Sequence, residues 1–247
     1  MGKQKGLCIM ETKKKGIFKY DEVRISNALE KFSDEFEVPG IVGNLIKTAL
    51  GIAYTSTEPL GQRKFPIRSY QEIADATPYS QYQKLCETVH GESHSLESVR
   101  NEQNKWFNDP SVGEVDPLAV FGLKISLWSL HGEAPEGTLS KTCPVCSFEP
   151  DFFYLNSDGE FNLVCARCDY DWRYKRTSCP FCGSELPTDI SYLVSMNNFA
   201  RVRECHSCGR KLLGVDARHS NRPFSYILEK LITGHVLGSF EPAEKRS

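Results

Sequence analysis

The feature that most constrains the fold is a set of eight cysteines in the second half of the chain, arranged as four CxxC pairs. The first 140 residues contain only two of the ten cysteines, so the thiols are concentrated in one region. A CxxC pair turns the backbone so that both sulfur atoms point to the same place, and two pairs supply the four ligands of a tetrahedral site. The pairs therefore predict four-cysteine metal sites.

The four pairs form an internal repeat. The first copy contains CPVC, FFYL, NSDG, EFNLV, CARC and DYDWRYKR, and the second contains CPFC, ISYLV, SMNNF, ARVRE, CHSC and GRKLLGVDAR. The copies begin 36 residues apart, and 18 and 22 residues separate the two pairs within them. A hairpin brings the pairs of one copy together, whereas mixed ligand sets would require intertwined repeats. We therefore expect two sites, one formed by Cys143, Cys146, Cys165 and Cys168, and the other by Cys179, Cys182, Cys205 and Cys208.

Four thiolates accept either metal that commonly occupies such sites, so the pattern predicts two mononuclear sites that hold Fe or Zn. Two other uses of paired cysteines fit less well. A thioredoxin-like redox pair lies between a strand and a helix, and a cubane iron–sulfur cluster draws its cysteines from a more compact run. Each copy is too short to bury a self-sufficient core, so we expect the metal to contribute on the order of 10 kcal/mol per site.

The first half of the chain has apolar residues at helical spacing, which predicts an all-α domain over residues 20–132. Ser69 and Glu72 match a capping box that begins one of its helices. Asp116 and the following proline begin the last helix, although residues 118–130 are apolar enough for a buried strand to be the alternative. The other predicted helical segments are 25–36, 41–53, 79–89 and 96–107.

The complete chain is expected to be an α+β protein, with a helical domain followed by two tandem rubredoxin-like or zinc-ribbon units and a C-terminal helix. The stretch HGEAPEGTLSK has two glycines and a proline without periodicity, which places the boundary there. The predicted segments are a flexible basic arm at 1–19, the helical domain at 20–132, a linker at 133–141, ribbons at 142–176 and 177–218, and the C-terminal helix and tail at 219–247.

Composition and motifs exclude several classes of protein. The most apolar stretch, residues 41–53, is too short and polar to cross a bilayer, and no signal peptide is recognisable. We therefore expect a cytoplasmic protein without membrane insertion, where thiols bind metals rather than form disulfides. Cys8 and Cys86 stand alone, and His206 lies between two cysteines that already complete a site. Without a nucleophile elbow or phosphate loop, the chain is not expected to be an enzyme.

The residues around the cysteine pairs match a known family. Pro150 follows Cys146 by four residues, Trp172 follows Cys168 by four, and Arg176 comes four residues later. The fourth pair is preceded by Glu204 and followed by Asp216, and with these offsets the sequence resembles the formate dehydrogenase accessory (formation) protein family, FdhE-like. The match covers roughly Cys143 to Asp216. The chain departs from the family in having Ser147 where glycine is usual, and Lys211 and Leu213 where an aromatic residue and a lysine are usual.

This resemblance implies a cytoplasmic, non-catalytic maturation factor. Such proteins bind the catalytic subunit of a molybdenum or tungsten formate dehydrogenase during assembly, and their paired cysteines hold iron in rubredoxin-like sites. Trp172 and Arg176 are expected on one face of a strand, where they are candidates for binding the partner. The alternative for this face is ordinary packing, with Trp172 covering the metal and Arg176 paired to an acid. The sequence leaves the oligomeric state open, a homodimer included.

Two rival functions come from other classes. A rubredoxin-like electron-transfer role is one, although the sequence offers no second redox cofactor. The other is a zinc-ribbon protein that binds nucleic acid, because basic and aromatic residues alternate in both copies. From Lys141 onward, however, the chain has 14 basic and 13 acidic residues, unlike the strongly basic domains that bind phosphate backbones. The residues of this candidate groove are Arg173, Lys175, Arg176, Arg201, Arg203, Arg210, Lys211, Tyr170, Trp172, Tyr174 and Phe199.

Overall fold

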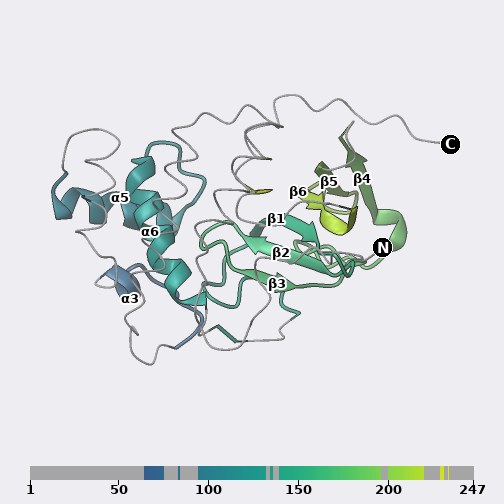
Figure 1. Ribbon diagram of the computed structural model, residues 1–247, viewed down its shortest axis with the longest axis horizontal. Helices are drawn as coiled ribbons and strands as arrows, with labels where there is room; N and C mark the ends of the chain where they lie inside the picture. The colour runs from purple at the N-terminus through teal and green to yellow at the C-terminus, as the bar shows by residue number, and fades with distance from the viewer. Residues whose placement is uncertain are drawn as a thin grey trace, which may run out of the picture. The chain divides into compact units, whose positions relative to one another are not determined.

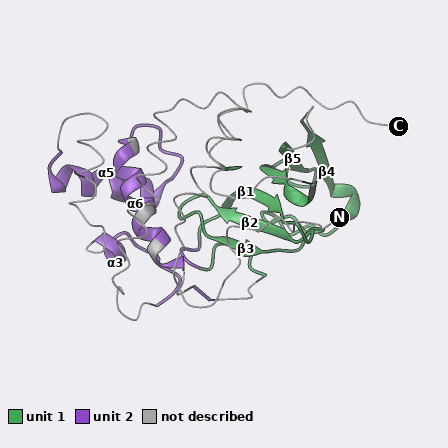
Figure 2. Ribbon diagram, in the orientation of Figure 1, with its two compact units in different colours: residues 1–11, 136–144, 148–247 green, residues 12–135, 145–147 purple. Residues whose placement is uncertain are grey.

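The structure is a computed structural model that describes residues 64–74, 83, 94–131, 134–135, 139–195, 200–219, 229–230 and 233. The chain divides into two compact units (Figure 2). Residues 12–135 with 145–147 form the helical unit, and residues 1–11, 136–144 and 148–247 form the sheet unit. The helices predicted over 25–36 and 41–53, nearly all of 79–89, and the lone Cys8 and Cys86 lie outside the described residues.

Two helices of the helical unit match the predicted ones: α5 (Leu96–Asn108) and α6 (Pro117–Ser129) (Figure 1). The Ser95 side chain caps α5 by accepting a backbone N–H of its first turn at 3.2 Å. The Asp116 carboxylate caps α6 in the same way at 2.9 Å. The segment after Asp116 is therefore a helix, and the alternative of a buried strand is wrong.

A third helix, the short α3 (Gln71–Ala74), begins where the capping box predicts a start. The Glu72 carboxylate accepts the Ser69 N–H at 2.9 Å and its hydroxyl at 3.1 Å. The backbone bond is the half of a capping box in which the acidic side chain reaches back to the N-cap residue. The hydrogen bond from the Ser69 N–H to the Glu72 carboxylate therefore confirms the helix start that the capping box predicts.

A buried glutamine connects these three elements. Gln103 of α5 is fully buried; its Oε1 accepts the Tyr70 hydroxyl at 2.8 Å, and its Nε2 donates to the Ala119 carbonyl of α6 at 3.0 Å. A buried amide without partners would destabilise the fold by about 1–3 kcal/mol, so these bonds favour one register of α5 on α6. The apolar core around it includes Ile67, Ile73, Val99, Phe107, Leu123 and Leu127.

The sheet unit is built on one six-stranded sheet with the order β3-β2-β1-β6-β5-β4 (Figure 1). Both predicted hairpins are present as antiparallel pairs, β1 with β2 and β4 with β5. The repeat predicts two tandem ribbons, but in the structure the two copies are the two halves of one sheet. The strands are β1 (Pro150–Leu155), β2 (Phe161–Cys165), β3 (Asp171–Arg173), β4 (Ile190–Val194), β5 (Ala200–Cys205) and β6 (Lys211–Asp216).

The two halves meet at a parallel pair, β1 with β6, in which Phe153 lies opposite Gly214. A Cβ atom at Gly214 would overlap both the carbonyl oxygen and the ring of Phe153, so a glycine is required at this point of the join. Without the pairing, each strand would leave a row of unpaired N–H and C=O groups at an edge. The pairing of β1 with β6 satisfies the hydrogen-bonding groups of both open edges, which is the physical reason that the two predicted ribbons form one sheet.

A buried arginine reinforces the join. Arg203 of β5 is 3% exposed, and its guanidinium lies 5.0 Å from the centre of the Phe161 ring in β2. Its Nη2 donates to the carbonyls of Arg176 and Ser178, both at 3.0 Å. Arg203 thus connects the second half of the sheet to a strand of the first half and to the segment between the copies.

The end of β6 carries a buried carboxylate with two cationic partners. Asp216 accepts Arg201 and Arg218, both at 2.7 Å. The hydrogen bonds from Arg218 and the charge of Arg201 outweigh the effect of burial and hold the pKa of Asp216 at about 2. This carboxylate is therefore ionised at any physiological pH, and its charge is compensated locally.

Near the C-terminus, the described residues Glu229, Lys230 and Thr233 are helical, and they belong to the sheet unit. Glu229 and Thr233 are buried. These residues agree with the predicted C-terminal helix. In the described part of the chain, no helix combines the length and the apolar character needed to cross a membrane.

Candidate metal centres

The four CxxC pairs form turns with the same backbone hydrogen bonds. In each turn, the N–H of the first cysteine donates to the carbonyl five residues later, at distances of 2.8–3.0 Å. This bond closes the backbone around the two sulfur atoms, as a CxxC metal site requires. The donors are Cys143, Cys165, Cys179 and Cys205.

The residue that follows each pair has a positive φ, 56° at Ser147, 54° at Asp169, 83° at Gly183 and 70° at Gly209. This conformation suits glycine, whereas a residue with a Cβ adopts it at a steric cost. The first copy therefore forms its turns with two strained residues and the second with two glycines. Ser147 occupies the position where the resemblance leads one to expect glycine.

Replacing Ser147 with glycine is expected to raise the free energy of unfolding of the metal-loaded protein by about 1 kcal/mol, because the strain at φ 56° is removed. Urea unfolding would measure it. The matched control is Gly209→Ser, which imposes the same strain where no atom lies within 4 Å of the added Cβ. It should destabilise the protein by a similar amount. Equal stability of both variants and the parent chain would contradict the strain argument.

The turns bring the cysteines together in the two sets expected from the repeat. Within each set, all four sulfur atoms lie within 4.8 Å of one another. The Sγ atoms of Cys143 and Cys168 are 3.4 Å apart, those of Cys179 and Cys208 are 3.8 Å apart, and those of Cys182 and Cys205 are 3.7 Å apart. A tetrahedron with metal–sulfur bonds of about 2.3 Å has edges of about 3.8 Å. Both sets therefore fit a single tetrahedral ion. We call them the first and second centres.

The two centres differ in exposure. All four cysteines of the first centre are buried, none more than 2% exposed. In the second centre, Cys179 and Cys205 are buried, whereas Cys182 and Cys208 are exposed. The second centre therefore has one exposed cysteine residue in each of its two turns.

The surroundings of the second centre favour thiolate at one position and thiol at another. Burial opposes ionisation of Cys179, but hydrogen bonds from the backbone N–H groups of Cys182 and Phe181 lower the pKa of its thiol to about 7. Burial raises the pKa of the Cys205 thiol to about 12. Four sulfur atoms this close cannot all carry charge without a cation, so full ionisation requires a metal.

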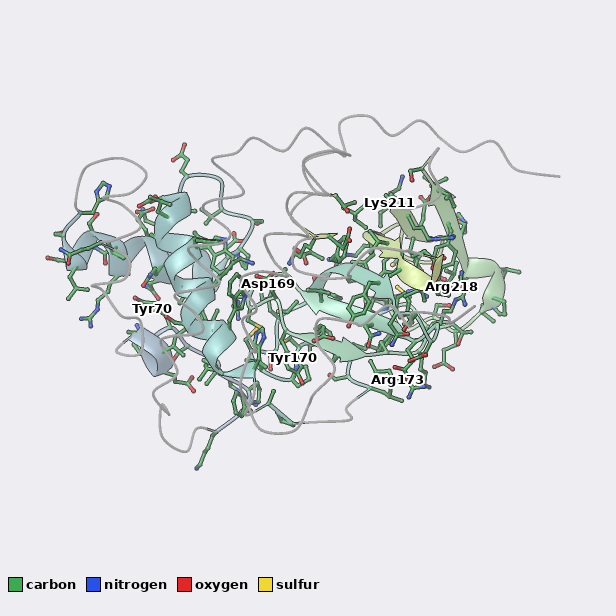
Figure 3. All side chains as sticks on the ribbon, in the orientation of Figure 1. Tyr70, Asp169, Tyr170, Arg173, Lys211 and Arg218 are labelled. Atoms are coloured by element: carbon green, nitrogen blue, oxygen red, sulfur yellow. The ribbon has the colours of Figure 1, made fainter. Side chains whose placement is uncertain are left out.

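A lysine that no sequence motif marks, Lys230, lies against the first centre. Lys230 Nζ donates to the carbonyl of Cys165 at 3.0 Å and to the carboxylates of Asp169 and Asp151, both at 2.7 Å. Burial opposes its charge, but the two carboxylates raise the pKa of Lys230. In the sequence, the only sign of this contact is that Lys230 is a single lysine among the apolar residues of the predicted C-terminal helix. Figure 3 labels Asp169, the residue directly after the second cysteine pair.

An ion pair connects the two copies close to their cysteine turns. Arg210 donates to both oxygens of Glu149, at 2.9 and 2.8 Å, and its guanidinium lies 3.6 Å from the centre of the Phe181 ring. In the first copy, Arg167 lies 4.1 Å from the centre of the Phe148 ring. Each half of the sheet thus places an arginine on an aromatic ring beside its cysteines.

His206, the exposed histidine beside the second centre, is not one of the four side chains that form that centre. His206 lies between Cys205 and Cys208 and is exposed, and its backbone N–H donates to the Asp189 carbonyl at 2.7 Å. The described side chains that converge at this centre are the four cysteines.

The two candidate partner-binding residues do not share a strand face. Strand β3 ends at Arg173, three residues before Arg176, so the expected alternation does not reach it. Trp172 is 3% exposed and its Nε1 donates to the Ser140 carbonyl at 2.7 Å, which makes it part of the core of the sheet unit. Arg176 is exposed. The strand therefore does not extend far enough to place both residues on one face, and of the two only Arg176 is exposed.

The candidate nucleic-acid groove is largely occupied within the protein. Its aromatic residues Tyr170, Trp172 and Tyr174 are buried, and Phe199 lies outside the described residues. Arg203 is also buried. Figure 3 shows Tyr170, Arg173 and Lys211 of this set. The remaining basic residues other than Arg176 are paired with acids, as Arg173–Glu160, Lys175–Glu185, Arg201–Asp216, Arg210–Glu149 and Lys211–Glu204.

Comparison with known proteins supports the fold. The structure is similar to the crystal structure of the FdhE protein from Pseudomonas aeruginosa, with a TM-score of 0.58 and 15% sequence identity. The similarity covers 87% of this chain and 91% of the other. No protein-family model matches the sequence, and a search of curated proteins finds no relative. The chain therefore has an FdhE-like fold, as the resemblance in its cysteine region predicts.

Proposed function

We propose that this chain is a non-catalytic accessory protein that binds the catalytic subunit of a formate dehydrogenase during assembly of that enzyme. The observation that carries the proposal is the FdhE-like fold, which extends over 87% of the chain and is not limited to the cysteine region. The motif around the cysteine pairs supports the same assignment independently, because Pro150, Trp172 and Arg176 match the family's offsets. The client would be a molybdenum or tungsten enzyme.

The two four-cysteine sets would each hold one ion, iron or zinc. A bound ion would join the two turns of each set through their four sulfur atoms, and iron would in addition supply a one-electron couple. The side chains of this protein support the surrounding shape: Lys230 bonds to the turn that begins at Cys165, and the exposed Glu149–Arg210 pair links the two copies beside their cysteine turns. The result is a rigid sheet that can serve as a docking platform.

Arg176 is the described residue best suited to contact the client. It is exposed, and within the described part of the chain its side chain makes no ion pair. Its neighbours Arg173 and Lys175 are already paired with acids, at 3.1 and 3.0 Å. Arginine is enriched among the residues that dominate interface energies, because its planar guanidinium forms several bonds at once.

Replacing Arg176 with alanine is expected to weaken capture of the formate dehydrogenase catalytic subunit by about 2 kcal/mol, roughly 30-fold in Kd. Binding of purified client to immobilised protein would measure it. Metal content and Tm should not change, because the contact of Arg176 with Arg203 uses the backbone carbonyl. The matched control is Arg173→Ala, which removes an exposed but paired arginine from the same stretch and should retain affinity. Unchanged capture by the Arg176 variant would direct the search for the docking surface to the helical unit.

A further inference from the structure

We propose that the two centres differ in exchange: the second gives up and takes up its metal through contact with dissolved thiol ligands, whereas the first retains its metal, with Lys230 closing it. The inference rests on the proposed function in one respect, that both sets of cysteines bind metal. The inference adds that the two centres have different roles. One centre is structural, and the other is an exchange site open to thiophilic cations and the thiolates that carry them.

The second centre is accessible to solvent at two of its four cysteines. Replacing a ligand in a tetrahedral thiolate site requires an incoming group to approach while one cysteine leaves, so access by solvent controls the rate. Cys182 and Cys208 are exposed and come from different turns of the second centre. An incoming thiolate can therefore approach either turn. At the first centre the most exposed cysteine is Cys146, at only 2%.

The closure of the first centre depends on a distant segment. Lys230 is 65 residues from Cys165 and 61 from Asp169, yet it bonds to both and also to Asp151. Its ammonium group lies beside a turn that carries two thiolates in the loaded protein. Its charge therefore favours the anionic centre, and its hydrogen bonds oppose opening of the turn.

The second copy cannot form the equivalent contact. Asp169 and Gly209 occupy the same position in the two copies, each directly after its CxxC pair and each with a positive φ, 54° and 70°. Both N–H groups donate to the carbonyl of the first cysteine in the pair, at 3.2 Å from Asp169 and 2.7 Å from Gly209. The backbone geometry is shared, but Gly209 has no carboxylate to hold a lysine. The difference between the centres thus lies in what covers the turn.

The test uses the full chain loaded with zinc. The zinc content per chain is measured first, and the release of zinc to a chromophoric chelator is then followed over time. Two phases of one equivalent each are expected, at rates that differ by about 10-fold or more. Alkylating the protein with iodoacetamide at the end of the fast phase and mapping the labelled peptides should identify Cys179, Cys182, Cys205 and Cys208, besides Cys8 and Cys86, which belong to neither centre. Lys230→Met should accelerate the slow phase by about 10-fold and leave the fast phase unchanged. The control Lys211→Met removes an exposed lysine and should alter neither phase.

The outcomes separate the inference from the proposed function. Fewer than two zinc ions bound per chain would reject the inference together with the metal-binding part of the proposed function. Two ions released in a single phase, or labelling of the first centre in the fast phase, would reject the inference and leave the metal-binding proposal intact. These measurements on the parent chain decide the matter even if Lys230→Met fails to fold. A folded Lys230→Met chain with an unchanged slow phase would remove Lys230 from its assigned role.

Discussion

Replacing both Cys165 and Cys168 with serine is expected to unfold the sheet unit, with loss of the cooperative thermal transition and of the metal of the first centre. Both cysteines are fully buried, and Cys165 is the last residue of β2. A four-thiolate ion contributes on the order of 10 kcal/mol, which is comparable with the entire stability of a typical domain, about 5–15 kcal/mol. The remaining backbone hydrogen bonds cannot compensate for a loss of that size.

Far-ultraviolet circular dichroism and differential scanning calorimetry of the metal-loaded proteins would measure this loss. Cys8→Ser, which removes a thiol outside the four pairs, is the control and should leave metal content and Tm as in the parent chain. Treating the parent chain with a strong chelator should reproduce the unfolding, and adding metal back should reverse it. A serine variant that melts at the parent's temperature would show that the sheet does not depend on its first centre.

The second large effect is expected from Gly214→Ala, which should destabilise the sheet unit by about 3 kcal/mol or more. Alanine introduces a Cβ into space filled by the backbone carbonyl and ring of Phe153, and the backbone of a paired strand has little freedom to move away. The strain would fall on the β1–β6 pair, so hydrogen exchange should become faster in these two strands than in the β4–β5 hairpin. Gly113→Ala is the matched control, because an added Cβ there meets nothing within 4 Å. Equal urea midpoints for the two variants would contradict the requirement for glycine at the join.

The sequence predicts the local structure of this chain well. The spacing of Val99, Gln103 and Phe107 predicts α5, and Asp116 with the proline after it marks the start of α6. The hairpins follow from apolar runs separated by turn residues, as in NSDG, where Asn156 accepts the N–H groups of Asp158 and Glu160 at 3.0 and 2.8 Å. These features depend on residues close in the chain, where periodicity and turn chemistry carry the information.

The features that the sequence does not predict depend on distant contacts. The pairing of β1 with β6 joins residues about 60 positions apart, and its only sign in the sequence is one glycine within an apolar run. The burial of Trp172 depends on a carbonyl 32 residues away, at Ser140. The contact of Lys230 with the Cys165 carbonyl likewise exists only because folding brings together residues that are 65 positions apart. Hydrophobic period and motif spacing do not encode such pairings, because many registers satisfy the same local pattern.

The parallel join between β1 and β6 also sets an order of events during synthesis on the ribosome. Phe152 pairs with Leu213, which is added to the chain 61 residues later. At a translation rate of about 5–20 residues per second, that delay is roughly 3–12 s. Once Cys168 has been added, the first copy has all four of its cysteines, but until Leu213 is added one edge of β1 has no neighbour and can pair with another nascent chain. Early capture of metal by the first copy would hold it compact through this interval, so metal supply during translation should influence how much of the protein escapes aggregation.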